Sequence, residues 1–100
     1  MHRRWTVYIL RCNDGSLYTG ITTDLAARVA AHGAGRGAKY TRAHAPVTLV
    51  WCKRNQDATA ARRLEWALRH RSRAEKLALV EGDEKIWRRL RAALRRAARS

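Results

Sequence analysis

The sequence predicts a single mixed α+β domain whose elements follow in the order β-β-α-β-α-α-α. Three observations lead to this prediction. The first 22 residues carry two segments dense in β-branched and aromatic residues, with a turn sequence between them. Beyond residue 57, apolar residues recur at helical spacing behind residues that commonly cap helices. A chain of 100 residues suffices for one hydrophobic core, and no internal repeat or low-complexity linker divides it.

A β-hairpin is expected at the start of the chain. Residues 5–12 and 17–22 are the two strands, and residues 13–15 read Asn-Asp-Gly, a turn-forming sequence. Residues 5–12 carry apolar groups at both odd and even positions, which is typical of a central strand covered on both faces.

Two registers of this hairpin compete, because its loop can hold two or three residues. A two-residue loop of Asp14 and Gly15 places Tyr8 and Tyr18 on opposite faces of the sheet. A three-residue loop with Gly15 in the left-handed conformation pairs Tyr8 with Gly20 and leaves both phenols on one face. We favour the second register, because a glycine opposite Tyr8 also leaves space beside its hydroxyl.

The middle of the chain predicts a helix, a loop and a strand. Thr23 is a suitable N-cap for a helix over residues 24–32, which Gly33 ends. Residues 33–40 are rich in glycine and basic residues, so we expect a surface loop. Residues 47–52 are expected to form the third strand.

Capping residues predict the next two helices. Asp57 is a plausible cap for a helix from Ala58 to about Arg71. Ser72 and Glu75 have the spacing of a capping box, so another helix begins there and runs towards residue 80.

The last segment predicts a basic amphipathic helix. Beyond the break expected at Gly82, Ile86, Leu90 and Leu94 recur every four residues and are surrounded by arginines. We favour docking of this apolar stripe on the body of the protein over insertion into a membrane surface.

The charge of the chain favours a polyanionic partner. Lysine and arginine number 22 against 8 acidic residues, a net charge of +14. Most of the basic residues are arginines, whose planar guanidinium groups bind phosphate oxygens in pairs. Nucleic acid is therefore a better candidate than a membrane. Charge alone does not separate an enzyme from a passive binder.

The chain is expected to act in the cytoplasm. No apolar run approaches the roughly 20 residues that cross a bilayer, and the start lacks the apolar stretch and cleavage site of a secretory signal. Cys12 and Cys52 lack the spacing of metal ligands and are expected to be buried thiols.

Asp24, Arg28 and His32 are four residues apart and share one face of the first predicted helix. Taken alone, they are best interpreted as a surface ion pair between Asp24 and Arg28, with a solvated histidine at the helix end.

Glu65 lies at the margin of the buried side of its helix, which Leu64 and Leu68 mark. Taken alone, it is best interpreted as an ion pair with Arg62 or Arg69. A single glutamate can also serve Mg²⁺, which commonly uses one or two carboxylates and lets substrate phosphate complete its coordination.

In their order along the chain, these residues resemble the GIY-YIG endonuclease family. Tyr8 lies in Val-Tyr-Ile, Tyr18 begins Tyr-Thr-Gly, and Arg28, His32 and Glu65 follow. The stretches that carry the resemblance are residues 7–12, 14–22, 37–41 and 72–76. It covers residues 5 to about 80 and is closest to the short stand-alone bacterial members, with a more distant similarity to the incision domain of UvrC.

The resemblance implies an α+β fold with a small three-stranded antiparallel sheet flanked by helices. Residues 1–82 would form the nuclease-like domain, and residues 83–100 the extra basic helix packed on it or extending from it. Both tyrosines, Arg28, His32 and Glu65 would meet in one site.

The resemblance also implies a role for each of these residues. Glu65 would hold one divalent ion, Mg²⁺ or Mn²⁺, and Arg28 would neutralise the pentavalent phosphate. Tyr8 would be the general base, although a phenol with a pKa near 10 is poorly suited to this near neutrality. Tyr18 and His32 would orient water and phosphate or help to relay the proton.

Further contacts to nucleic acid are expected from residues outside that site, on the glycine-rich loop and elsewhere. These residues are Arg11, Arg36, Lys39, Tyr40, Arg42 and Arg69. We expect Trp51, Trp66 and Trp87 to be core or docking aromatics rather than platforms for bases.

Three hypotheses of function follow from these features. The first is a metal-dependent DNA endonuclease that hydrolyses a phosphodiester directly, in DNA repair or processing. The second is a basic nucleic-acid-binding module with a weak or vestigial site. The third, a purely structural partner protein, explains the charge less well. The sequence leaves the oligomeric state open.

Overall fold

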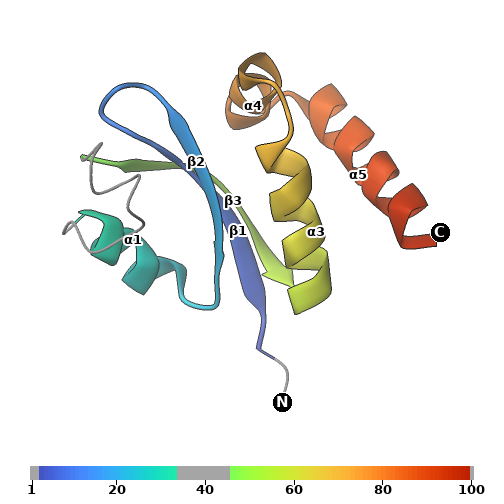
Figure 1. Ribbon diagram of the computed structural model, residues 1–100, viewed down its shortest axis with the longest axis horizontal. Helices are drawn as coiled ribbons and strands as arrows, with labels where there is room; N and C mark the ends of the chain where they lie inside the picture. The colour runs from blue at the N-terminus through green and yellow to red at the C-terminus, as the bar shows by residue number, and fades with distance from the viewer. Residues whose placement is uncertain (1–2, 34–45, 100) are drawn as a thin grey trace.

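The chain forms a three-stranded antiparallel sheet flanked by helices, which confirms the predicted α+β fold. A computed structural model describes residues 3–33 and 46–99. The strand order is β2-β1-β3, so β1 lies in the centre and both its neighbours are edge strands. The strands are β1 (Trp5–Arg11), β2 (Leu17–Thr22) and β3 (Thr48–Gln56). The helices are α1 (Leu25–Gly33), α3 (Ala58–Arg69), α4 (Arg73–Val80) and α5 (Glu84–Arg99). Helix α1 lies on one side of the sheet, and α3, α4 and α5 lie on the other (Figure 1).

The hairpin has the three-residue loop that places both phenols on one face. Gly15 has φ +85°, and the backbone N–H of Cys12 donates to the carbonyl of Ser16 at 2.9 Å. Tyr8 is paired with Gly20, as the favoured register predicted. The left-handed glycine is therefore what sets the positions of the two tyrosines.

The predicted helix starts are confirmed at two of three positions. The Asp57 carboxylate accepts from the N–H of Ala60, and the Ser72 hydroxyl accepts from the N–H of Glu75. The prediction of Thr23 as the cap of α1 is wrong, because the Asp24 carboxylate accepts from the N–H of Ala27 at 3.1 Å. A carboxylate one residue later provides the stronger acceptor for the helix N-terminus.

Two predicted element ends are also wrong. Strand β3 continues to Gln56, four residues beyond the expected end, because it pairs with β1 as far as Trp5. The polar sequence after Cys52 concealed this extension. Helix α3 ends at Arg69, two residues early, where the N–H of the capping residue His70 donates to the carbonyl of Trp66.

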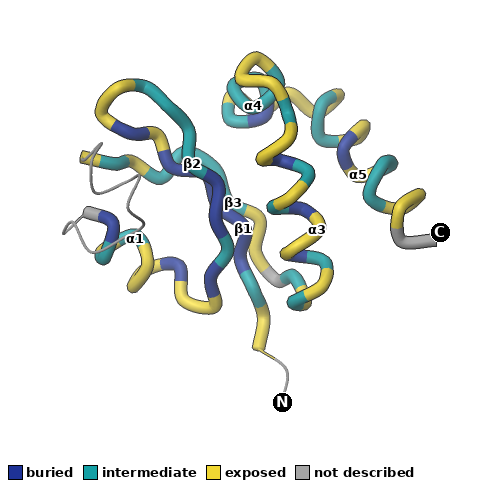
Figure 2. Tube along the Cα trace, viewed as in Figure 1, coloured by how far each residue is buried: buried dark blue, intermediate teal, exposed yellow. Residues whose placement is uncertain are grey.

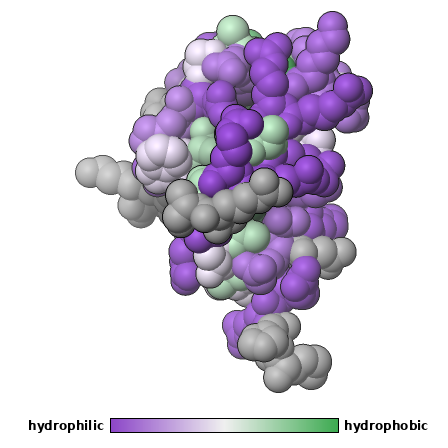
Figure 3. Space-filling view, turned by 90° about the vertical axis from the view of Figure 1, so that its right-hand side faces the viewer, coloured by the Kyte–Doolittle hydropathy of each residue, from purple (hydrophilic) through white to green (hydrophobic). Residues whose placement is uncertain are grey.

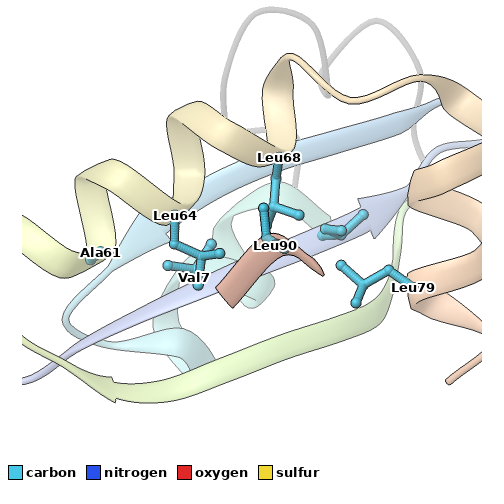
Figure 4. Close-up of a cluster of buried hydrophobic side chains, with 7 residues drawn as sticks. Val7, Ala61, Leu64, Leu68, Leu79 and Leu90 are labelled. Atoms are coloured by element: carbon cyan, nitrogen blue, oxygen red, sulfur yellow. The ribbon is translucent and has the colours of Figure 1, made fainter. Parts of the chain in front are cut away.

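The main hydrophobic core lies between the sheet and α3. Val7 and Ile9 of β1 are fully buried, and they pack against Leu64 and Leu68 of α3. Figure 4 shows Val7 and the two leucines of α3 pointing toward one another, with Leu90 of α5 among them. The other face of β1 carries a smaller cluster of Tyr8, Leu10 and Leu25 beneath α1. Central strand β1 is buried over most of its length (Figure 2), as its apolar pattern predicted.

Helix α5 docks on the body as its apolar stripe predicted. Leu90 is buried, and Ile86 and Leu94 pack against the main core. The turn that precedes it is formed at Gly82, which has φ +90°. The N–H of Gly82 donates to the carbonyl of Leu79, and that of Asp83 donates to Ala78, so α4 ends in a Schellman motif.

The three tryptophans that were expected to be core or docking aromatics differ in their surroundings. Trp51 and Trp87 contact each other where β3 meets α5, with ring centroids 5.9 Å apart and planes tilted by 58°, as expected of docking aromatics. The same expectation is wrong for Trp66, whose surface is 62% exposed. Sequence periodicity did not show that Trp66 is exposed, because this residue lies between the buried positions Leu64 and Leu68 of α3.

Both cysteines are free; Cys12 is buried and Cys52 is half-buried. Burial raises the pKa of the Cys12 thiol above its usual value. None of the helices within residues 3–33 and 46–99 is both apolar enough and long enough to cross a bilayer.

Candidate active site

A cleft of about 760 Å³ runs along β2, the edge strand of the sheet. Four of the five residues that the resemblance assigned to the site line it, and they come from β1, β2, α1 and α3. These residues are Tyr8, Tyr18, Arg28 and Glu65. Arg69 of α3 and Lys76 of α4 also line it. The cleft is therefore assembled from residues far apart in the sequence.

Gly20 gives the Tyr8 hydroxyl its place beside β2. A Cβ atom at Gly20 would lie 2.5 Å from the Tyr8 oxygen and 2.6 Å from the ring carbon that bears it. The phenol of Tyr8 therefore crosses the edge strand where that strand has no side chain. This is the space that the favoured hairpin register predicted.

His32 lies behind the two tyrosines and is not among the residues that line the cleft. It is 1% exposed, and its Nε2 is 3.2 Å from the Tyr8 hydroxyl. Its ring centroid is 6.0 Å from that of Tyr8 and 5.5 Å from that of Tyr18. The interpretation of His32 as a solvated residue at the helix end is thus wrong, since α1 turns its last residues toward the sheet.

The surroundings of Tyr8 keep its phenol protonated at neutral pH. Burial, with smaller contributions from Tyr18 and Glu65, raises the pKa of Tyr8 to about 12, against the lowering effect of Arg28. Burial and the nearby Arg28 lower the pKa of His32. The neutral imidazole of His32 and the neutral phenol of Tyr8 can share one hydrogen bond, but neither group carries a charge.

Glu65 is the acidic residue among those that line the cleft, within the part of the chain that the structure describes. Its side chain is 19% exposed, and one carboxylate oxygen is 3.1 Å from Nη1 of Arg69. The ion pair with Arg69 that the sequence indicated is therefore present. The second oxygen of the carboxylate takes no part in that bond.

The donor set fits a cation that arrives together with a phosphate. One carboxylate lines the cleft beside Arg28, Arg69 and Lys76, so the site alone carries more positive than negative charge. Groups of three or more His, Cys, Asp or Glu that could hold a metal are absent from the described residues. Mg²⁺ accepts such a sparse set when substrate oxygens and waters complete its octahedron.

The structure describes only two of the six residues that were predicted as further contacts to nucleic acid. Arg69 lines the cleft, whereas Arg11 is exposed at the end of β1 and does not. The other four, Arg36, Lys39, Tyr40 and Arg42, lie outside the described residues. Sequence reasoning gave no role to Lys76, although it belongs to the capping-box stretch that carried the resemblance.

The sheet, the cleft along its edge strand and the residues in that cleft define a GIY-YIG domain. Residues 4–78 match the family described as the GIY-YIG catalytic domain, and the chain belongs to this family. GIY-YIG domains form a nuclease superfamily whose substrates are nucleic acids.

The relatives of the chain are short proteins of similar length. It is 46% identical over 81 residues to a UPF0213 protein of Streptococcus sanguinis, covering 81% of this chain and 93% of the relative. A UPF0213 protein of Halobacterium salinarum is 49% identical over 73 residues, covering 73% of this chain and 95% of the relative. The solution structure of a UPF0213 protein from Bacillus halodurans matches with a TM-score of 0.53 and 42% identity, over 83% of this chain and 92% of that one.

Replacing Gly20 with alanine is expected to move the Tyr8 phenol out of its position. The new Cβ would meet the ring carbon and the oxygen at distances that side chains do not adopt, so we expect a loss of about 1–3 kcal/mol in the free energy of unfolding. A spectroscopic pH titration should show Tyr8 ionising closer to the ordinary pKa of 10 than to the value near 12.

Gly82→Ala is the matched control for this variant. It also adds one Cβ, but nothing lies within 4 Å of it, and the cost of about 1–2 kcal/mol comes from the left-handed backbone. Its tyrosine titration should equal that of the wild type. An unchanged titration in Gly20→Ala would contradict the position assigned to Tyr8.

Proposed function

We propose that this protein is a metal-dependent endonuclease that hydrolyses a phosphodiester of DNA directly, without a covalent intermediate. The observation that carries the proposal is the cleft along β2, to which four elements contribute two phenols, a guanidinium and a carboxylate. The net charge of +14 supports a polyanionic substrate.

Glu65 is the residue that would hold the divalent ion, Mg²⁺ or Mn²⁺, one per site. When bound there, the ion would polarise the scissile phosphate and stabilise the departing oxygen. Arg28 lines the cleft from α1 and would neutralise the charge of the pentavalent phosphate. Arg69 and Lys76 line the same cleft and would contact flanking phosphates.

Tyr8 would take the proton of the attacking water. Its pKa near 12 opposes this role in the resting site. Positive charge near the phenol favours its ionised form, and Arg28 already acts in that direction. Tyr18 would orient the water and the phosphate from the rim of the cleft. His32 would position the Tyr8 ring through the bond at 3.2 Å.

The test is a nicking assay on supercoiled and branched DNA, with Mg²⁺ or Mn²⁺ and with a chelator. We expect a nicked product that depends on the added ion, because the described residues provide a single carboxylate in the cleft and no other acid. A product formed equally well in the presence of the chelator would contradict the assignment of metal to Glu65.

A nucleic-acid-binding module with a vestigial site is the second candidate. Two observations favour it: the phenol of Tyr8 is held neutral, and Glu65 is already paired with Arg69. This function requires binding that weakens steeply with salt and no metal-dependent product. Filter binding across a salt series, run beside the nicking assay, separates the two functions.

A further inference from the structure

Trp66 is the large hydrophobic residue that the described part of the chain leaves exposed, with 62% of its surface accessible. It follows Glu65 on α3. The ring of His70 stacks on it, with centroids 4.1 Å apart and an angle of 27° between the planes. His70 Nδ1 also donates to the carbonyl of Trp66 at 2.7 Å. The indole is therefore supported on one side and presented to solvent in a defined orientation.

Trp66 forms part of a groove of about 450 Å³ between α3 and α5. The two helices lie side by side on the same side of the sheet (Figure 1). The α3 side contributes Trp66 and His70 together with Arg62, Arg63 and Arg71. Leu94 and two small residues of α5, Ala93 and Ala97, form the opposite wall. No acidic side chain is among these described lining residues.

The composition of the groove favours a ligand that has both a flat apolar face and negative charge. The face of the molecule that carries α5 is mostly hydrophilic, with small hydrophobic patches between the polar side chains (Figure 3). A second copy of this chain fits the groove poorly, since each copy would bring its own arginines into the contact. A nucleotide of a single strand offers a base that stacks on an indole and a phosphate that pairs with arginine.

We propose that an unpaired base of a nucleic-acid strand stacks on Trp66, while Arg62 and Arg63 contact the adjoining phosphates. This inference rests on the proposed function in one respect: the strand that binds here is the one whose backbone passes through the cleft. Glu65 and Trp66 are consecutive residues of α3 and point about 100° apart around the helix, Glu65 into the cleft and Trp66 into the groove. A strand bound at the carboxylate would therefore reach the groove by passing around α3. Helix α5 lies beyond residues 4–78, which match the family, and so the groove depends on the C-terminal extension of this chain.

The proposal predicts weaker binding of single strands when the indole is removed. Fluorescence anisotropy with a labelled oligothymidylate, in a buffer containing a chelator, measures binding without cleavage. Trp66→Ala should weaken binding about tenfold, the usual effect of removing one stacking platform. Trp66→Leu should weaken it equally, since leucine keeps apolar area but has no aromatic face. Trp66→Phe should retain most of the affinity.

Salt dependence separates stacking from charge. The three Trp66 variants should keep the wild-type slope of log K against log salt, whereas Arg62→Gln should reduce that slope by about one. Arg88→Gln is the control for the loss of one positive charge outside the groove, since this exposed residue of α5 does not line it. Binding of a blunt duplex should be the same for Trp66→Ala and for the wild type.

Three results would overturn the inference. They are equal single-strand affinity in Trp66→Ala and wild type, equal weakening for duplex and single strand, and a wild-type dimer that Trp66→Ala converts to a monomer. Nicking that needs Glu65 while Trp66 has no effect would leave the proposed function standing without this groove. Binding that depends on Trp66, with no metal-dependent product, would support the groove and refute the nuclease.

Discussion

Glu65→Gln is expected to reduce Mg²⁺-dependent nicking at least about a thousandfold, which corresponds to about 4 kcal/mol in the activation barrier. Glutamine keeps the shape of the side chain but removes the negative charge that would hold the ion. Among the described residues that line the cleft there is no second carboxylate to replace it. The fold should persist, because the pair with the exposed side chain of Arg69 contributes no more than about 0.5 kcal/mol.

Glu75→Gln is the matched control for this prediction. Glu75 also forms an ion pair four residues apart, in its case with Arg71 at 3.5 Å, and it does not line the cleft. A glutamine at this position preserves the capping box that begins α4. We expect nicking close to that of the wild type. If Glu65→Gln and the further variant Glu65→Ala were both fully active, the assignment of the metal to Glu65 would be wrong.

The local elements of the fold could be predicted because short-range chemistry determines them. The glycine opposite Tyr8 favoured one of the two hairpin registers, and in that register the left-handed backbone of Gly15 places both tyrosines on one face. Asp57 and Ser72 marked the starts of α3 and α4 within one residue. At both helix starts the deciding hydrogen bond joins residues three positions apart in the chain.

What the sequence did not predict depends on contacts between distant elements. Strand β3 runs on to Gln56 because β1 offers it partners, not because its own residues favour a strand. His32 is buried because the end of α1 packs behind the two tyrosines. The exposure of Trp66 could not be predicted either, because it depends on how far α5 covers α3.

The residues that line the candidate cleft were easier to predict from the sequence than their arrangement in it. The resemblance named the residues of the cleft, but it did not indicate that His32 stands behind Tyr8 or that Lys76 faces the cleft from α4. Nor did the resemblance indicate in which direction the surroundings shift the pKa of Tyr8. Burial disfavours the charged phenolate of Tyr8, and Tyr18 and Glu65 add to this effect against Arg28, so the pKa of Tyr8 rises rather than falls.

Tyr8→Phe is expected to lower the rate of nicking by about 10²–10⁴, the usual contribution of a general base. Substrate binding should change little, since the ring remains and the basic side chains of the cleft are untouched. Stability should fall by about 1–3 kcal/mol, because buried Nε2 of His32 loses the partner that lies 3.2 Å away. Tyr18→Phe removes a hydroxyl from the same cleft and should have a smaller effect on the rate.

The pH dependence of nicking gives the sharper test of Tyr8. With its pKa raised to about 12, only a small fraction of the phenol is ionised near neutrality. That fraction grows about tenfold for each unit of pH below the pKa, so the wild-type rate should climb in proportion as the pH is raised from 7. The residual rate of Tyr8→Phe should lack this rise. A fluorinated tyrosine at position 8, whose phenol is more acidic, should move the whole profile to lower pH. A profile that stays in place with the fluorinated residue would assign the base to another group.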